Sequence, residues 1–140
     1  MGCLIGIDFG VKFSGIAITD TNQIIASPLD TCKTNELIPF IRKYDKNEKV
    51  DALIIGKPIQ KDGSPSDIEK EIIEFITNLK KNFPDKSIYR QDERYTSKIS
   101  SKVILESGIK KNKRKNKRLI DKISATLILQ SFLEYKSKNS

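Results

Sequence analysis

The first thirty residues contain three short apolar segments typical of β-strands. Residues 3–8 form a continuous apolar run that ends at Asp8, and residues 15–20 alternate between apolar and polar positions. Residues 24–29 supply a third segment, in which Pro28 indicates an edge strand or the end of a strand. Because the connections between them are short, the three segments are expected to form an antiparallel meander.

Helical periodicity then alternates with further strand-like runs. Ser66 and Glu69 have the spacing of a capping box, and the amphipathic helix that follows them ends before Pro84. The later elements are expected to be a helix around 37–44, a strand at 50–56, a helix from 66 to 83, a strand at 87–91, and helices at 96–107 and 119–135.

This order of elements predicts the fold class. A meander followed by helix, strand, helix, strand and two helices indicates an α/β protein with a mixed five-stranded sheet flanked by helices. The later strands should run parallel to the first, because helices connect them. A chain of 140 residues has the usual length of one domain, so residues 1–140 are expected to form a single unit.

The charge of the chain is concentrated in one segment. The sequence holds 26 Lys and Arg against 18 Asp and Glu, and seven of the basic residues lie between 110 and 118 with no acid among them. This segment favours a polyanion such as nucleic acid, although a solvated, mobile charge run is the simpler alternative. Its basic members are Lys110, Lys111, Lys113, Arg114, Lys115, Lys117 and Arg118.

Several classes of site are excluded by composition. The chain contains no histidine, so Ser-His-Asp and Cys-His nucleophilic sites and imidazole metal ligands are ruled out. Cys3 and Cys32 lie on apolar segments without metal-ligand spacing and are expected to be free thiols in a reducing compartment. Because no targeting segment or run of about 18 apolar residues is visible, the expected location is the cytoplasm.

Three carboxylates are candidates for a shared site. Asp8 ends the first strand and Glu93 follows the fifth, so parallel strands would bring both to one edge of the sheet, with Asp92 as a competing candidate. Asp121 is expected to open the last helix on its apolar face, which it shares with Ala125. Taken singly, these acids have simpler interpretations: a turn after a strand, a solvated loop, and a helix N-terminal aspartate favoured by the macrodipole.

Three carboxylates held together would repel one another and take up protons unless a cation lies between them. An all-oxygen ligand set suits Mg²⁺ or Mn²⁺. Such ions activate water and stabilise the leaving oxygen of a phosphodiester. The sequence therefore predicts metal-dependent phosphodiester hydrolysis with Asp8, Glu93 and Asp121 as ligands.

The ordered segments IGIDFGVKFSGIAITD, ASPLDT, ALIIGKP, DGSPS, QDERYTS and DKISATLILQ closely resemble the YqgF family, also called RuvX. The resemblance implies a ribonuclease-H-like fold, and members are described as Holliday-junction resolvases or as nucleases that process the precursor of 16S ribosomal RNA. The family's acidic positions fall on Asp8, Glu93 and Asp121.

The resemblance also suggests residues around the acids. Lys12, Arg94 and Thr96 match family positions, which implies phosphate contact or support of the site. The chain departs from the family pattern at Phe13, where an arginine is usual, and we expect Lys57 to replace part of the lost charge. No cluster of aromatic residues that would form a base-stacking platform is visible in the sequence.

The expected function is thus a cytoplasmic endonuclease that processes the 5′ end of pre-16S ribosomal RNA, with structured RNA favoured as partner and possible association with the ribosome. Two alternatives stay open: a resolvase acting on branched DNA, and a weakly active RNA-binding module of ribosome assembly. An actin-like ATPase or sugar kinase also has a phosphate motif like IGIDFGVKFSG, but such enzymes need two domains of this type. A monomer and a homodimer are both compatible with the sequence.

Overall fold

The computed structural model describes residues 2–60, 62–93 and 113–138. Five strands form one sheet in the order β3-β2-β1-β4-β5. β1 pairs antiparallel with β2, and β2 with β3, whereas β4 and β5 run parallel to β1. The predicted mixed five-stranded sheet is therefore confirmed. The strands are β1 (Cys3–Asp8), β2 (Phe13–Thr19), β3 (Ala26–Lys33), β4 (Val50–Lys57) and β5 (Ser87–Asp92).

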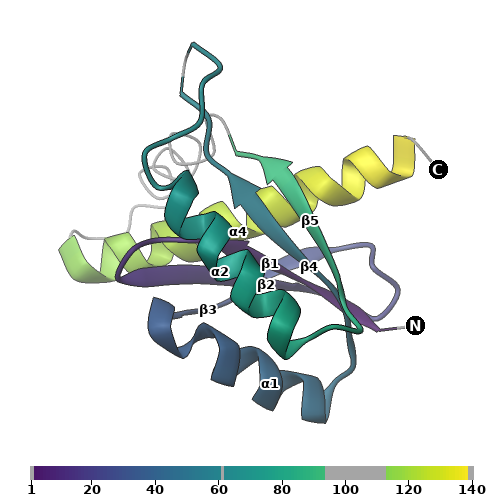
Figure 1. Ribbon diagram of the computed structural model, residues 1–140. Coiled ribbons are helices and arrows are strands. Elements are labelled where there is room, and N and C mark those ends of the chain that lie inside the picture. Colours follow the sequence, from purple (N-terminus) through teal and green to yellow (C-terminus); the bar gives the residue numbers. More distant parts are fainter. Residues whose placement is uncertain (1, 61, 94–112, 139–140) are drawn as a thin grey trace.

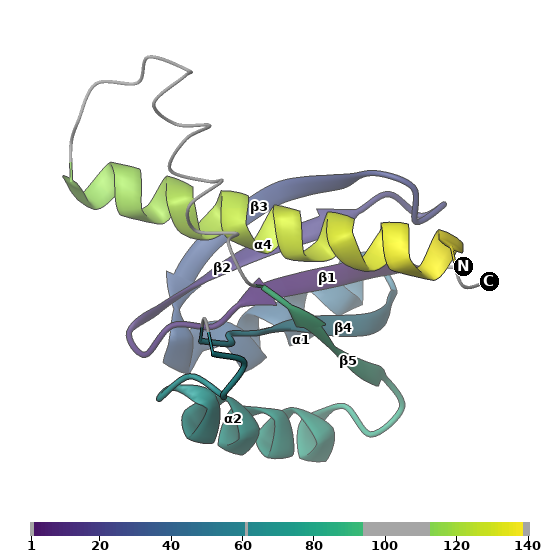
Figure 2. The same cartoon turned by 90° about the horizontal axis from the view of Figure 1, so that it is seen from above.

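Helices cover both faces of the sheet (Figure 1). Figure 2 shows α4 (Lys113–Lys138) crossing one face, and α1 (Leu37–Asn47) with α2 (Glu69–Asn82) on the other. A short 3₁₀ helix, η1 (Thr34–Glu36), joins β3 to α1. Apolar side chains of alternate strand positions fill two cores, one beneath α1 and α2 and one beneath α4.

The edge position predicted from Pro28 is confirmed, because β3 is an outer strand. Pro28 pairs with Ala17 next to an irregularity in the register, where a missing backbone N–H interrupts few hydrogen bonds. β3 is nevertheless longer than expected and continues to Lys33. Alternation alone did not predict this extension, because its side chains are mostly exposed or half-buried.

The capping box predicted at Ser66 and Glu69 is wrong. α2 begins at Glu69, its N-cap is Ile68, and no side chain caps it. The carboxylate of Glu69 instead pairs with Arg90 of β5, with 2.6 Å between Oε1 and Nη2. A tertiary ion pair has thus replaced the local contact that the spacing suggested.

α4 begins six residues earlier than predicted, at Lys113 instead of Leu119, so its first turns include most of the basic segment. Lys and Arg are good helix formers, which explains how a polar run can extend an amphipathic helix. Asp121 accordingly lies in the third turn and not at the helix start, so the macrodipole interpretation of Asp121 is wrong. The helix expected at 96–107 lies outside the described residues.

α4 packs very closely on the sheet at three glycines. A Cβ at Gly6 of β1 would collide with the side chain of Leu129. A Cβ at Gly15 of β2 would collide with the backbone carbonyl of Asp121, and a Cβ at Gly56 of β4 would collide with Ile128 and with the carboxylate of Glu93. Ala125 of α4 is fully buried in the same interface. Small residues on both sides therefore bring Asp121 down onto the strand ends.

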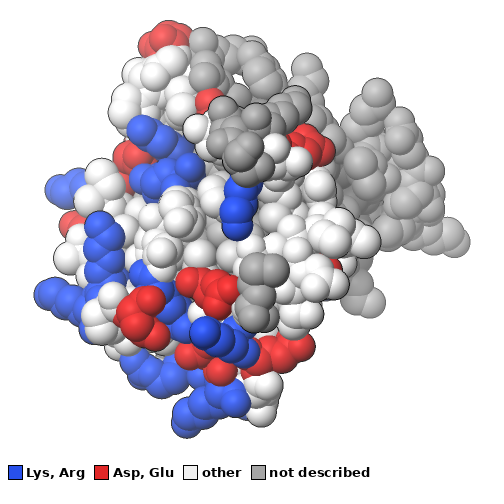
Figure 3. Space-filling model, turned by 90° about the vertical axis from the view of Figure 1, so that its right-hand side faces the viewer, with Lys and Arg blue, Asp and Glu red and all other residues white. Residues whose placement is uncertain are grey.

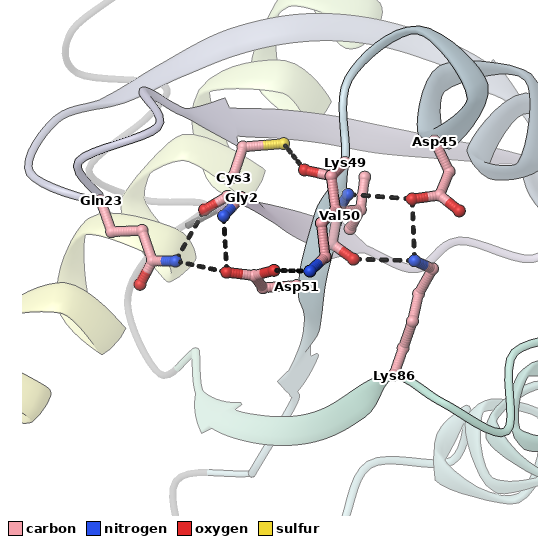
Figure 4. Close-up of polar contacts among 8 residues, drawn as sticks. All are labelled: Gly2, Cys3, Gln23, Asp45, Lys49, Val50, Asp51 and Lys86. Carbon is pink, nitrogen blue, oxygen red and sulfur yellow. Dashed lines mark hydrogen bonds and ion pairs between the residues drawn. The ribbon is translucent and has the colours of Figure 1, made fainter.

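The amino ends of the parallel strands are closed by a separate polar network (Figure 4). The Lys86 ammonium donates to Asp45 at 2.8 Å and to the Val50 carbonyl at 2.7 Å, and the Lys86 side chain is only 4% exposed. Asp51 accepts from the Gly2 amide at 2.7 Å. Figure 3 shows this end of the molecule, where basic and acidic side chains are interspersed.

Among the described helices, none combines the length and the apolar character needed to cross a lipid bilayer.

Candidate functional site

Asp8 and Glu93 lie at the same edge of the sheet. Asp8 is the last residue of β1, and Glu93 directly follows β5, which runs parallel to β1 through β4. The Glu93 amide donates to the Lys57 carbonyl at 3.2 Å, which continues the ladder one step beyond β5. Asp121 reaches this edge from α4, because its backbone lies against Gly15, the pairing partner of Asp8.

The three acids interact electrostatically. Burial raises the pKa of Asp8 well above its usual value, and the charges of Glu93 and Asp121 raise it further. All of these influences disfavour the charged form of Asp8. Three acids drawn from β1, the segment after β5 and α4 therefore form one electrostatic cluster, which we call the acidic cluster.

Glu93 is perturbed in the same direction. Burial raises its pKa to about 7, Arg90 opposes this change, and the neighbouring charges of Asp92 and Glu69 add to it. Asp92, the competing candidate, belongs to β5 and is exposed. Glu93, in contrast to Asp92, is half-buried, and its carboxylate lies against Gly56 beneath α4.

The loop that follows Asp8 is held by two hydroxyl groups. The Ser14 Oγ accepts from the Gly10 amide at 3.2 Å and lies 2.8 Å from the Thr34 Oγ1, which in turn donates to the Gly10 carbonyl. The Thr34 amide donates to the Lys12 carbonyl at 2.9 Å. Both hydroxyls were missed from the sequence, because only the register of β2 and β3 brings them together.

Arg90 fixes the strand ends beside Glu93. Its guanidinium pairs with both carboxylate oxygens of Glu69, at 2.6 and 3.3 Å, and donates to the Gly56 carbonyl at 3.1 Å. These contacts join β5 to α2 and to the carboxyl end of β4, where Glu93 packs. An arginine inside a strand gave no sequence signal for this role.

Phe13 lies at the same edge, on the β3 side of Asp8. The Arg118 guanidinium of α4 lies over the Phe13 ring, 5.4 Å from its centroid, and the Thr31 hydroxyl donates to the Arg118 carbonyl at 2.7 Å. Arg118 therefore places a positive charge beside Phe13, the position at which the family resemblance led us to expect an arginine. Lys57, the expected substitute, ends β4 on the far side of β1.

A cavity of about 330 Å³ opens beside Phe13, and we call it the Phe13 cavity. It combines two ammonium groups, one aromatic ring and one side-chain amide, and no acid lines it. Its lining residues are Val11, Lys12, Phe13, Lys33 and Asn35.

The residues predicted to contact nucleic acid divide into three groups. Lys12 lies in the loop after β1, at the edge that carries Asp8, and lines the Phe13 cavity. The first two turns of α4 contain Lys113, Arg114, Lys115, Lys117 and Arg118. Arg94, Thr96, Lys110 and Lys111 lie outside the described residues.

The acidic cluster suits a divalent cation by its chemistry. Its donors are carboxylate oxygens, and their mutual repulsion is the kind that Mg²⁺ or Mn²⁺ relieves. Within the described ranges, no group of three Asp, Glu or Cys side chains is already arranged to hold an ion.

Comparison with known proteins identifies relatives over nearly the whole chain. The family model described as "RuvX: Holliday junction resolvase" matches residues 2–135. A protein of Flavobacterium psychrophilum named "Putative pre-16S rRNA nuclease" is 48% identical over 133 residues, which cover 95% of this chain and 97% of the relative. A protein of the same name from Bacteroides fragilis is 48% identical over 136 residues, 97% and 99% of the two chains.

Solved structures support the fold. RuvC from Thermus thermophilus matches with a TM-score of 0.59 at 11% identity, and the match covers 97% of this chain and 96% of RuvC. The same protein in complex with a Holliday junction substrate matches with a TM-score of 0.57 at 12% identity, over 96% of each chain. At this identity the match shows the fold alone, and that fold is the predicted ribonuclease-H-like one.

Proposed function

The chain belongs to the RuvX family, and from this premise we propose that it is a metal-dependent endonuclease that processes the 5′ end of pre-16S ribosomal RNA. The relatives from Flavobacterium and Bacteroides are named "Putative pre-16S rRNA nuclease", and they match this chain over nearly their full length. The proposed setting is the cytoplasm, with precursor RNA or an assembling ribosomal subunit as the partner.

One observation supports the reaction most directly: the electrostatic coupling of Asp8 to Glu93 and Asp121 at the carboxyl edge of the sheet. A surface that only binds phosphate gains nothing from concentrated negative charge. A buried acid whose pKa is raised by neighbouring acids is expected where a cation is to be bound.

In this proposal Asp8, Glu93 and Asp121 would hold the metal. A bound Mg²⁺ or Mn²⁺ supplies an activated water and stabilises the leaving oxygen of the phosphodiester. Ser14 and Thr34 fix the loop after Asp8, and Arg90 fixes the strand end beside Glu93. Lys12 and Arg118 would orient the phosphates that flank the scissile bond.

The test compares wild type with Asp8→Asn on a pre-16S RNA fragment in Mg²⁺ and in Mn²⁺. We expect Asp8→Asn to reduce cleavage by at least about a hundredfold, because one ligand is lost. Its thermal unfolding midpoint should be unchanged or higher, since the substitution removes a repelling charge. Unchanged cleavage by Asp8→Asn would refute the site.

The substrate is tested in the same buffer with a four-way DNA junction. We expect cleavage of the RNA precursor near its 5′ end and much slower cleavage of the junction. Faster cleavage of the junction would assign the chain to resolution of branched DNA. Binding of RNA without cleavage in either metal would assign it to the non-catalytic alternative.

A further inference from the structure

We propose that the Phe13 cavity binds one unpaired nucleotide of the substrate strand, next to the scissile phosphate. The base would stack on the Phe13 ring, and the phosphate would lie between Lys12 and Lys33. This inference rests on the proposed nuclease function and adds to it that the cleaved strand is single-stranded at this position.

The position of the cavity follows from the register of the sheet. Asp8 pairs with Gly15, and Phe13 lies two residues further along β2 toward the same edge. Two residues of a strand span about 7 Å. The Phe13 ring is therefore close enough to Asp8 for both to contact neighbouring nucleotides of one strand.

The walls of the cavity are built from adjacent segments. Phe13 and Lys33 are direct cross-strand partners in β2 and β3. The Thr34 amide donates to the Lys12 carbonyl at 2.9 Å, which ties the loop after β1 to the start of η1. The backbones of both lysines that line the cavity are thus fixed by pairing with neighbouring segments.

The surroundings of the Phe13 ring favour stacking of a base on it. Arg118 covers one face of the ring at 5.4 Å, and the Thr31 contact to the Arg118 carbonyl fixes the helix there. A base on the ring would extend a stack of guanidinium and aromatic groups, which is a common way to bind unpaired nucleotides. A single ring stacks any base, so this site would not select sequence.

A neighbouring cavity provides an internal comparison. It shares Val11 and Asn35 with the Phe13 cavity and has a similar volume of about 390 Å³, but Glu71 and Glu74 of α2 line it. These acids would repel a phosphate. The backbone of the substrate strand should therefore follow the β3 side of this edge and avoid the α2 side.

The first test measures binding in EDTA, so that no cleavage occurs. Labelled single-stranded RNA and a duplex of the same sequence are titrated with wild type and with Phe13→Leu, which keeps an apolar side chain but removes the ring. We expect Phe13→Leu to weaken single-strand binding about tenfold and duplex binding less than twofold, since stacking of one base corresponds to about 5- to 150-fold in affinity. The control Tyr135→Leu removes an exposed ring near the other end of α4 and should leave both affinities unchanged.

A second measurement does not depend on the folding of a variant. An abasic site is moved along the single-stranded region around the cleavage position of the pre-16S RNA fragment, where the position of the scissile phosphate fixes the register, and binding to the wild-type protein is measured. One position should lose affinity by the same factor as Phe13→Leu, and Phe13→Leu should lose nothing further with that oligonucleotide. Equal binding at every abasic position would overturn the proposal, as would equal loss of single-strand and duplex affinity in Phe13→Leu.

The phosphate contact is tested with Lys33→Ala. We expect the slope of log affinity against log salt for single-stranded RNA to become less steep by about 0.7, the value for one phosphate. Lys46→Ala, in the last turn of α1 at the opposite edge, should leave the slope unchanged. An unchanged slope in Lys33→Ala would remove this lysine from the proposed site.

The two proposals fail in different ways. If wild type cleaves RNA but Phe13→Leu binds single strands like wild type, the nucleotide site is wrong and the nuclease assignment stands. If wild type shows the expected stacking signature but cleaves nothing in Mg²⁺ or Mn²⁺, the nuclease assignment is wrong and the nucleotide site stands.

Discussion

Glu93 and Asp8 make the stability of the metal-free protein depend on pH. Both carboxyl groups have raised pKa values in the folded state, that of Glu93 from 4.5 to about 7. The folded state therefore binds more protons than the unfolded chain above about pH 4.5, so stability decreases as the pH rises. From the Glu93 shift, we expect the free energy of unfolding in EDTA to fall by about 2–3 kcal/mol between pH 5 and 8.

Urea unfolding at several pH values measures this slope. Glu93→Gln cannot ionise and should show a flatter profile over the same range. Saturating Mn²⁺ should raise the free energy of unfolding more at pH 8 than at pH 5, because the ligands must lose their protons to bind the ion. A stability that increases from pH 5 to 8 in EDTA would contradict the raised pKa values.

At this scale the sequence predicted the acids but not the groups that hold them. Asp8, Glu93 and Asp121 could be named because strand ends and an apolar helix face mark their positions. Ser14, Arg90 and the glycines under α4 could not, because their contacts depend on the register of strands far apart in the sequence. The role of the three acids as metal ligands stays a prediction.

At the scale of elements, the pair of Arg90 and Glu69 joins β5, α2 and the end of β4. Both side chains are largely buried, with 25% and 12% exposure. We expect Arg90→Met to lower the free energy of unfolding by about 2–3 kcal/mol. The substitution leaves the Glu69 carboxylate without its ion-pair partner and the Gly56 carbonyl without its hydrogen-bond donor. A double-mutant cycle with Glu69→Gln should give a coupling energy of about 1–3 kcal/mol.

Lys49→Met is the matched control for this cycle. Lys49 and Asp51 form a long pair of 3.9 Å in which the lysine is 79% exposed, so its loss should change stability by less than about 0.5 kcal/mol. Additive effects of Arg90→Met and Glu69→Gln would show that the two side chains contribute separately.

The start of α2 was predicted wrongly for the same reason that this ion pair was missed. Glu69 has the spacing of a local helix cap, but its carboxylate pairs with Arg90, which lies 21 residues further along the chain in β5.

At the scale of the whole molecule, a polar network that stabilises the fold and the acidic cluster lie at opposite ends of the strands. Lys86, Asp45 and Val50 lie at the amino ends of the parallel strands, and the acidic cluster lies at their carboxyl ends. We expect Lys86→Met to lower the free energy of unfolding by about 2 kcal/mol, since a buried charge pair is broken. Its kcat on RNA, measured well below the unfolding temperature, should equal that of wild type, and a large loss of kcat would contradict this separation.

The layered arrangement was the part of the structure that the sequence predicted best. Hydrophobic periodicity is set by burial on each face, so the meander, the parallel strands and their helical cover could all be inferred. The extension of α4 through the basic segment could not, because a polar run without an apolar stripe gives no period. Only the closeness of α4 to the sheet, permitted by Gly15 and Ala125, carries that segment to the edge where Asp8 ends β1.

The start of α4 places basic residues where a free helix disfavours them. Its first turn contains no acid, and its basic residues lie at the positive end of the helix dipole. Bound phosphates would relieve the repulsion between these basic side chains and the positive end of the helix dipole.

Replacing Lys113, Arg114, Lys115 and Lys117 with glutamine, which keeps helix propensity, should raise the free energy of unfolding of the free protein by about 1 kcal/mol. The same variant should bind RNA more weakly, with a salt slope less steep by up to about three for single strands. Thermal unfolding and binding at four salt concentrations measure both effects, and a variant that is less stable yet keeps the wild-type salt slope would show that this segment serves the fold and not the substrate.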